Sequence, residues 1–325
     1  MIQPKVSIVL ATYKPNAEYL YKQLNSIENQ TYKNIELLIC DDSGSTEENF
    51  RVSNIVESCM NKVSYKIFYN EVNKGSNKSF ERLTIESTGD LISYCDQDDI
   101  WEIDKIERLV KVLIKNDSSL VYSDLAIINS IDVKLKSSFK KMNFRLKHVE
   151  GVDCFFRLIR RNSVTGCTML IKSEIAKNAC PFPNQRVYPH DHWLSISSSV
   201  KGSISYIKKP LVKYRIHGSN QIGNKRFINI GNLEEYYKER IFRQLERYNF
   251  IEENVKLNQK NRLDINKERT MVMSRSDFFQ KPNIPNLFKL LKYIKYDFIL
   301  ITFEIIIFVV PREFGRRILK SLSKH

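Results

Sequence analysis

Glycine is scarce in this 325-residue chain, and no glycine-rich phosphate loop is present. The ten glycines form neither G-x-G-x-x-G nor G-x-x-x-x-G-K-[ST], the two patterns whose backbone N–H groups cradle phosphates. If the protein binds a phosphate group, we therefore expect a metal ion or basic side chains to hold it.

Cysteine is also sparse and is not arranged for metal binding. No C-x-x-C pair occurs, which argues against a structural zinc site and against a thioredoxin-like motif. We expect reduced thiols in the cytosol. The six cysteines are Cys40, Cys59, Cys95, Cys154, Cys167 and Cys180.

No apolar run is long enough to be expected to cross a membrane. The segment "FILITFEIIIFVV", at 298–310, has thirteen residues and contains Glu304, whereas a spanning helix needs about 20 apolar residues. Basic residues on both sides favour a helix lying on an anionic bilayer, and packing into the protein's own core or a dimer interface is the alternative. The flanking residues are Lys289, Lys292, Lys295, Arg312, Arg316, Arg317 and Lys320.

The N-terminal stretch "MIQPKVSIVLATY" has one lysine and only a short apolar run. This pattern predicts a first β-strand and not a signal peptide. We therefore expect a cytoplasmic protein, associated peripherally with the inner face of the cytoplasmic membrane.

Positive charge dominates the composition. Lys and Arg number 52 against 37 Asp and Glu, which gives a formal net charge of +15 and an isoelectric point near 9.4. Such a balance favours nucleic acid, an anionic membrane or a phosphorylated small molecule as partner. No zinc-finger, basic-zipper or RNA-binding signature accompanies the charge, so we do not expect nucleic acid.

Short apolar runs alternate with amphipathic stretches through the first third of the chain. Helices are predicted near 16–30, 47–60 and 76–87, between the runs "VSIVLAT", "IELLICDD", "VSYKIFYN" and "DLISYCDQDD". This alternation predicts an α/β fold with a mostly parallel sheet. The polar clusters "TYKP", "DDSGS" and "DQDD" each follow a run, so they should line one crevice at the carboxyl ends of the strands.

Three carboxylates stand close together in "ISYCDQDDIW": Asp96, Asp98 and Asp99. Like charges this close repel, and a divalent cation such as Mg²⁺ or Mn²⁺ would neutralise them while bridging to substrate phosphates. The alternative is that Asp98 and Asp99 cap the helix that begins nearby.

The motifs "VSIVLATYKP", "LLICDDSGSTEE", "NKGSNKSF" and "ISYCDQDDIW", in this order, resemble the nucleotide-sugar half of a family 2 glycosyltransferase. The segments "TGCTMLI", "HDHWL" and "YRIHGSN" resemble its rhamnosyltransferase-like branch, which builds bacterial surface polysaccharides. The resemblance covers roughly 4–222. It implies a GT-A fold, Rossmann-like with helices around the sheet, over 1–225, with a nucleotide-sugar half at 1–125 and an acceptor half at 126–225. A helical region with an amphipathic tail is expected at 226–325.

The resemblance also assigns roles to individual residues. Asp191, in "HDHW", would be the catalytic base, and Asp98 would be the first metal ligand, with Asp96 and His217 beside it. His190 and His192 flank Asp191, but zinc is not expected there because no further ligands follow at useful spacing. The residues expected at the nucleotide sugar are Thr12, Tyr13, Asp41, Asp42, Lys74, Asn77, Asp96, Gln97 and Asp99.

The implied function is an inverting, metal-dependent transfer of a sugar from a nucleoside diphosphate sugar to a hydroxyl of a glycan, free or linked to a polyprenyl diphosphate. The motifs look most like those of enzymes that use dTDP-rhamnose, and UDP-hexose or UDP-N-acetylhexosamine donors stay open. Two alternatives from other classes are a nucleic-acid-binding protein and a non-catalytic scaffold of polysaccharide assembly. A homodimer is also left open.

Overall fold

The computed structural model describes residues 3–142, 146–218 and 230–323. The chain divides into two compact units, Met1–Gly218 and Ser219–His325. The boundary expected between 225 and 226 lies outside the described residues, as do the last two residues of "YRIHGSN". Each unit is described by itself below.

The first unit is built around one mixed sheet. In the described residues its strands have the order β3-β2-β1-β4-β8-β6-β9-β5, and β7 pairs with β6. The strands are β1 (Val6–Thr12), β2 (Ile35–Asp41), β3 (Ser64–Tyr69), β4 (Leu91–Cys95), β5 (Ile100–Trp101), β6 (Leu120–Ile128), β7 (Lys134–Lys136), β8 (Met169–Lys172) and β9 (Ile204–Arg215).

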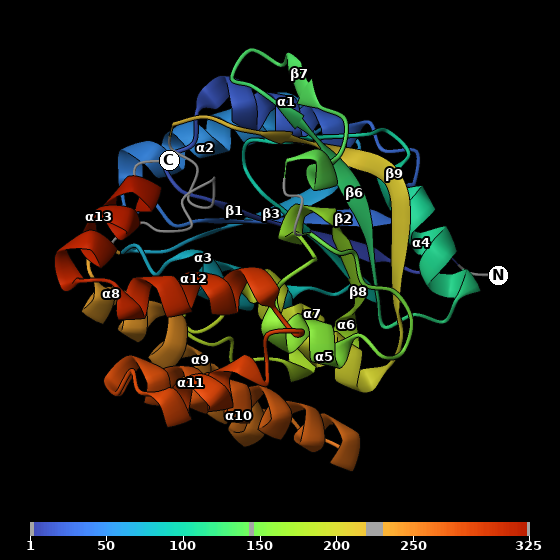
Figure 1. Ribbon diagram of the computed structural model, residues 1–325. Coiled ribbons are helices and arrows are strands. Elements are labelled where there is room, and N and C mark those ends of the chain that lie inside the picture. Colours follow the sequence, from blue (N-terminus) through green and yellow to red (C-terminus); the bar gives the residue numbers. More distant parts are fainter. Residues whose placement is uncertain (1–2, 143–145, 219–229, 324–325) are drawn as a thin grey trace. The chain divides into compact units, whose positions relative to one another are not determined.

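Helices connect these strands and cover both faces of the sheet (Figure 1). The α-helices are α1 (Ala17–Glu28), α2 (Thr46–Cys59), α3 (Ser76–Glu86), α4 (Lys105–Lys115), α5 (Phe155–Arg160), α6 (Ser173–Asn178) and α7 (His190–Lys201). Two short 3₁₀ turns, η1 (Phe139–Lys141) and η2 (Gly166–Thr168), complete the described elements of this unit.

The first four strands of the chain are parallel and follow the predicted alternation. Strand β1 pairs with β2 on one side and with β4 on the other. The chain moves outward from β1 to β3 and then returns to β4, so right-handed crossovers put α3 on the face opposite α1 and α2. The order of strands reverses between β1 and β4, which is where open α/β sheets bind their ligands.

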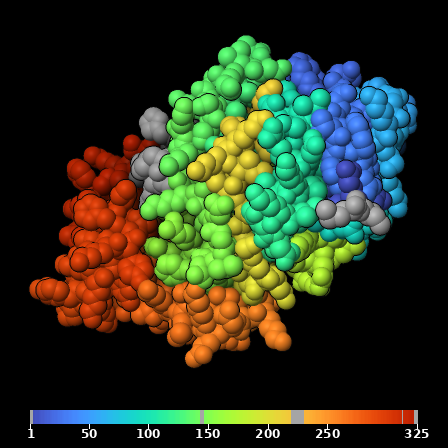
Figure 2. Space-filling model, turned by 90° about the vertical axis from the view of Figure 1, so that its right-hand side faces the viewer, coloured from blue at the N-terminus to red at the C-terminus, as the bar shows by residue number. Residues whose placement is uncertain are grey.

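The second half of the sheet departs from simple parallel pairing. Strand β8 lies antiparallel between β4 and β6, while β6 and β9 run parallel side by side. Pro210 has no N–H to donate, and the register of β9 against β6 shifts where Pro210 faces Asp124. Figure 2 shows β9 in yellow at the surface, beside the teal helix α4.

Strands β1, β2 and β4 do not alternate between buried and exposed residues. Every residue of β2 and β4 is buried, and six of the seven in β1 are buried, as expected for strands covered on both faces. Strand β3, at the sheet edge, is mostly exposed. Apolar side chains of α1, α2 and α4 close one face of this core, including Leu20, Leu24, Val52, Val56, Ile106 and Leu109.

The second unit is helical, as the sequence predicted. Its described helices are α8 (Leu233–Tyr237), the π-helical turn η3 (Lys238–Phe242), α9 (Arg243–Asn254), α10 (Gln259–Gln280), α11 (Ile284–Leu291), α12 (Phe298–Val309) and α13 (Arg312–Ser323). A small apolar cluster centred on Phe278, Leu290 and Ile301 joins α10, α11 and α12. Among the described residues, no helix is both long and apolar enough to span a membrane.

A buried ion pair fixes α12 against α10. Arg275 Nη2 donates to Glu304 Oε1 at 2.6 Å and Arg275 Nε donates to Glu304 Oε2 at 2.9 Å, and the two side chains are 2% and 0% exposed. The Tyr236 hydroxyl also donates to Glu304 Oε1, at 2.9 Å. The single acidic residue of the apolar tail segment is therefore inside the unit.

We expect Arg275→Met to lower the free energy of unfolding of the helical unit by about 3–5 kcal/mol, because Glu304 would stay buried without its partner. The double variant Arg275→Met/Glu304→Leu should recover most of the loss. Hydrogen exchange in peptides from α10 and α12 measures the effect in this unit.

The matched control is Lys289→Met, which breaks the exposed ion pair between Lys289 and Asp277 and should leave exchange unchanged. If Arg275→Met behaves like this control, the buried pair does not stabilise the unit.

Candidate functional site

The candidate site lies at the carboxyl ends of β1, β2 and β4. Thr12 ends β1, Asp41 ends β2 and Asp96 follows β4 directly. Because β1 is paired with both β2 and β4 in parallel register, the three strand ends meet at one edge of the sheet. The three polar clusters that the sequence placed in one crevice are thus neighbours.

Thr12 and Asp41 form one hydrogen-bonded group. Asp41 is fully buried, and its Oδ1 accepts hydrogen bonds from Thr12 Oγ1 at 3.0 Å and from Ser43 Oγ at 2.6 Å. These contacts fix the turn after β2 against the end of β1.

Gln97, which follows β4, forms hydrogen bonds with the backbone of Tyr13, which follows β1. Tyr13 N donates to Gln97 Oε1 at 2.8 Å, and Gln97 Nε2 donates to Tyr13 O at 3.3 Å. Tyr13 is 42% exposed, and the Lys14 ammonium lies 5.7 Å from the centroid of its ring.

Asp42 organises the loop that leads into α3. Its carboxylate accepts hydrogen bonds from Lys74 N, Gly75 N and Asn70 Nδ2, each at 2.8 Å. Gly75 has a φ of +84°, a conformation that favours glycine, and this turn starts α3. The Lys74 side chain is exposed on the same loop.

The structure brings Asp98 and His217 together, although they are 119 positions apart in the sequence. Asp98 Oδ2 lies 2.7 Å from His217 Nε2. The imidazole also packs against Tyr19, with ring centroids 5.4 Å apart. Both residues were predicted metal ligands, and their side chains contact each other.

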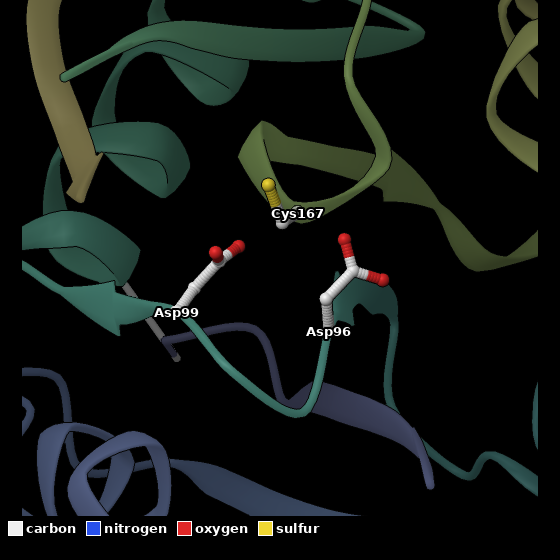
Figure 3. Close-up of side chains that lie close together, drawn as sticks. All are labelled: Asp96, Asp99 and Cys167. Carbon is white, nitrogen blue, oxygen red and sulfur yellow. The ribbon is translucent and has the colours of Figure 1, made fainter. Parts of the chain in front are cut away.

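Asp96 and Asp99 face a different partner, Cys167 of η2 (Figure 3). One ligand atom from each of the three residues lies within 4.8 Å of the others. Burial, together with the neighbouring charge of Asp98, raises the pKa of Asp96 to about 7 and that of Asp99 well above its usual value. The Asp191 charge also raises the pKa of Asp96, so Asp191 belongs to the same electrostatic group.

The residues present fit a divalent cation. Asp98 and Asp96 offer oxygen ligands and His217 offers a ring nitrogen, donor types that suit Mn²⁺ or Mg²⁺. The ligand atoms that the structure brings within 4.8 Å of one another are those of Asp96, Asp99 and Cys167. Within the described part of the chain, Asp99 Oδ2 is fully buried and has no hydrogen-bond partner. A positive charge near this group would lower the cost of burying the carboxylates.

Two basic side chains, Lys105 and Arg215, also lie at this site, and neither was among the predicted site residues. Lys105 is fully buried, and its Nζ donates to Ser93 Oγ at 3.5 Å and lies 2.9 Å from the Trp101 ring centroid. Burial lowers the pKa of Lys105 to about 7, although the acidic groups around it, including Asp96 and Asp99, act in the opposite direction.

Arg215 approaches from β9, where its backbone N donates to Asp99 Oδ1 at 3.1 Å and its Nε donates to Asp98 O at 2.8 Å. It also forms an ion pair with Asp132. The sequence offered a signal for Lys105, because this lysine lies on the buried stripe of α4 with Ile106, Leu109, Val110 and Leu113. For Arg215 the only signal was its place in "YRIHGSN".

Asp191 lies in the first turn of α7. Its Oδ1 accepts a hydrogen bond from His192 N at 2.6 Å. Burial raises the pKa of Asp191 to about 6, while hydrogen bonds from His192, Gly166 and Asn162 act in the opposite direction. Trp193 and Leu194 are buried behind it.

Gly166 permits this close arrangement. A Cβ at this position would lie 2.8 Å from His190 Nε2 and 3.4 Å from Asp191 Cβ. The "TGCT" motif therefore needs glycine where η2 meets the first turn of α7.

The two histidines beside Asp191 have structural contacts. His190 packs against Phe80 and Tyr94, with ring centroids 4.2 Å and 5.4 Å apart, and burial lowers its pKa to about 3. His192 Nε2 lies 2.6 Å from Leu158 O. In the described part of the chain, neither belongs to the Asp96–Asp99–Cys167 group.

Asn77 has a different environment from the one expected of a nucleotide-binding residue. It is 3% exposed, and its amide nitrogen donates to Pro183 O and to Tyr188 O, each at 2.8 Å. Its Oδ1 accepts from His190 N at 2.9 Å. The side-chain amide of Asn77 is thus occupied by protein backbone, and its role at the nucleotide sugar stays a prediction.

The comparisons with known proteins agree with this geometry. The family described as glycosyl transferase family 2 matches residues 7–167. An Escherichia coli protein named UDP-Glc:alpha-D-GlcNAc-diphosphoundecaprenol beta-1,3-glucosyltransferase WfgD is 29% identical over 223 residues, which cover 68% of this chain and 80% of the relative. An uncharacterized glycosyltransferase of Haemophilus influenzae is 27% identical over 73% of this chain and 90% of the relative.

Solved structures share the fold at low sequence identity. Staphylococcus aureus TarS 1-349 in complex with UDP-GlcNAc aligns with a TM-score of 0.55 and 17% identity over 98% of this chain and 90% of that chain. The mannosyltransferase PcManGT from Pyrobaculum calidifontis, in complex with GDP-Man and Mn²⁺, aligns with a TM-score of 0.55 and 14% identity over 99% of this chain and 86% of that chain. The chain belongs to glycosyl transferase family 2 and has the GT-A fold, so it is a glycosyltransferase.

Proposed function

We propose that this glycosyltransferase moves a sugar from a nucleoside diphosphate sugar to a hydroxyl of a cell-surface glycan, with inversion at the anomeric carbon. The observation that carries the proposal is the position of Asp191. Asp191 lies beside Gly166, and the next residue, Cys167, offers a sulfur atom within 4.8 Å of carboxylate oxygens of Asp96 and Asp99, so a proton acceptor lies near the carboxylate cluster. This is the pair of functions that a metal-assisted displacement needs.

We place a uridine diphosphate hexose first among the donors. The motifs alone favoured dTDP-rhamnose, but WfgD is named for UDP-Glc and TarS was solved with UDP-GlcNAc. WfgD is also named for a diphosphoundecaprenol-linked acceptor, which supports a lipid-linked glycan as the acceptor here. Thr12, Tyr13, Asp41 and Gln97, which lie at or just after the carboxyl ends of β1, β2 and β4, would form the part of the site that contacts the base and ribose.

Asp98, His217 and Asp96 would hold Mn²⁺ or Mg²⁺. When bound, the cation neutralises the charge that develops on the leaving diphosphate. Asp99 would support this site from behind, where Arg215 N donates to its carboxylate. The exposed Lys74, on the loop that Asp42 holds, adds a positive charge near the phosphates.

Asp191 would act as the base. Its carboxylate accepts the proton of the acceptor hydroxyl while that oxygen forms a bond to the anomeric carbon. The bond between the anomeric carbon and the phosphate oxygen breaks, and the nucleoside diphosphate leaves. A single displacement of this kind inverts the anomeric centre. The pKa of about 6 makes Asp191 a stronger base than an ordinary Asp and leaves it mostly ionised at pH 7.

Release of free nucleoside diphosphate from a donor panel, with Mn²⁺, Mg²⁺ or chelator, tests the proposal as a whole. The panel contains UDP-Glc, UDP-GlcNAc, UDP-Gal and dTDP-rhamnose. Acceptor-dependent release from a uridine donor supports it. Release from dTDP-rhamnose alone would restore the rhamnose interpretation, and no release from any donor with a lipid-diphosphate glycan acceptor would favour the scaffold.

We expect Asp98→Asn to abolish Mn²⁺-dependent donor binding, because one ligand charge and the contact with His217 are lost together. Calorimetry with UDP-Glc, with and without Mn²⁺, measures the change. Asp117→Asn is the matched control, since Asp117 pairs with Lys172 on the surface. Equal metal-dependent affinity in Asp98→Asn and the control would remove Asp98 from the ligand set.

We expect Asp191→Asn to lower turnover by about 10²–10⁴ with donor affinity nearly unchanged. In the wild type, turnover should rise with pH through about 6 and then level off, because the protonated carboxyl cannot accept a proton. Turnover in Asp191→Asn should lose this rise. A lost helix cap alone would cost stability of about 1 kcal/mol and little rate, so turnover above a tenth of wild type would contradict the role.

Peripheral membrane binding belongs to the same proposal. Helix α12 has its acidic residue buried and much of its apolar surface outside: Phe298 is 65% exposed and Val309 is 64% exposed, whereas Glu304 is 0% exposed. This reverses the usual arrangement of a surface helix. Ile299 and Ile306 of α12 are exposed as well, and exposed apolar side chains continue on α11 with Ile284 and Phe288 and on α13 with Phe314.

Charge complementarity favours an anionic bilayer as the occupant of this surface. Lys289, Lys292, Lys295, Arg316, Arg317 and Lys320 lie on the same helices or between them. Basic residues beside exposed apolar ones are typical of a surface that lies at the headgroup boundary. We place it at the inner face of the cytoplasmic membrane, where a lipid-linked acceptor would be presented.

We expect Phe298→Ser/Ile299→Ser/Val309→Ser to weaken binding to vesicles of phosphatidylglycerol at least tenfold, because three apolar side chains no longer enter the bilayer. Co-sedimentation at low and high salt measures it. The control is Phe50→Ser/Val72→Ser, which alters exposed apolar residues of the first unit. Undiminished binding by the triple variant would mean that α12 is not the contact.

A further inference from the structure

Asn77 connects α3 to the segment that precedes α7. Both ends of its side-chain amide are used, by Pro183 O, Tyr188 O and His190 N at 2.8 Å, 2.8 Å and 2.9 Å. The three backbone groups span eight residues of chain, and all converge on one buried side chain. These hydrogen bonds therefore fix the backbone that leads into α7 and to Asp191.

The start of α7 needs such a partner. Its N-cap residue is Pro189, which makes no side-chain capping hydrogen bond because proline has no side-chain acceptor. The first N–H groups of a helix have no partner within the helix. Asn77 supplies the acceptor for the first of them, at His190, from a separate helix.

Helix α3 is itself fixed to the donor side of the site. Asp42, after β2, accepts hydrogen bonds from Lys74 N and Gly75 N directly before the helix. One turn beyond Asn77, Glu81 accepts a hydrogen bond from Phe182 N. A continuous set of contacts thus runs from Asp42, through α3, to the residue next to Asp191.

We propose that Asn77 is a positioning residue that holds the first turn of α7 so that Asp191 faces the reacting hydroxyl. The inference rests on the proposed role of Asp191 as base. Asn77 touches neither substrate nor cation and acts through His190 and the backbone of α7. Displacing a base by about 1 Å can lower the rate on the order of 10²-fold. Loss of the Asn77 hydrogen bonds should therefore lower turnover and leave donor affinity unchanged.

The experiment is a double-mutant cycle on the full-length protein with UDP-Glc, Mn²⁺ and a lipid-diphosphate glycan acceptor. Asn77→Ala should lower kcat about 10–100-fold, with the donor Kd within twofold of wild type. In the Asp191→Asn background the same substitution should have no further effect, because a residue that acts only through Asp191 cannot add to its loss.

Asn116→Ala is the matched control. Asn116 Nδ2 donates to Ser205 Oγ at 2.9 Å, at the end of α4, so this substitution also removes an amide hydrogen bond of the first unit. It should leave kcat and donor Kd unchanged. If Asn77→Ala melts below the assay temperature, Asn77→Ser takes its place in the same cycle, since its hydroxyl is too short to reach all three groups.

The outcomes separate the two proposals. A tenfold weaker donor Kd with unchanged kcat would overturn the inference and return Asn77 to the nucleotide site. An equal loss of kcat in both backgrounds would mean that Asn77 does not act through Asp191. If Asp191→Asn alone retains full turnover, the proposed base fails first, and Asn77 has no base to position.

Discussion

The structure depends on the confinement of several carboxylates at one edge of a sheet. Asp96, Asp98 and Asp99 follow β4 within four residues, and Asp191 is close enough to raise the pKa of Asp96. Burial opposes the ionised form of each buried carboxylate, so the site is costly unless positive groups surround it. Arg215 and Lys105, whose pKa burial lowers to about 7, are basic side chains that the fold brings there.

These two basic residues reach the carboxylates from elements other than β1, β2 and β4. Lys105 enters through a helix whose other buried residues are apolar, and Arg215 enters through β9, which is paired with both β6 and β5. Each comes from a part of the chain remote from β1 and β2. The part of the chain that follows β4 thus brings basic side chains, His217 and Asp191 to the strand ends of the first half of the sheet.

The helical unit also contains buried charged side chains. It buries an Arg–Glu pair and leaves large apolar side chains exposed on α11, α12 and α13. Such a pair contributes less to stability than to the choice of one arrangement. It determines which face of α12 points inward, and therefore which apolar residues a bilayer can meet.

Local sequence pattern was enough to predict the alternation of strands and helices in the first third of the chain, because periodicity acts over a few residues. The tertiary contacts of the site could not be predicted in this way: Asp98 meets His217 while Asp96 and Asp99 face Cys167, Lys105 is buried, and Asn77 binds backbone. These contacts join residues up to 119 positions apart, and their partners follow from strand order and register, which local pattern does not encode.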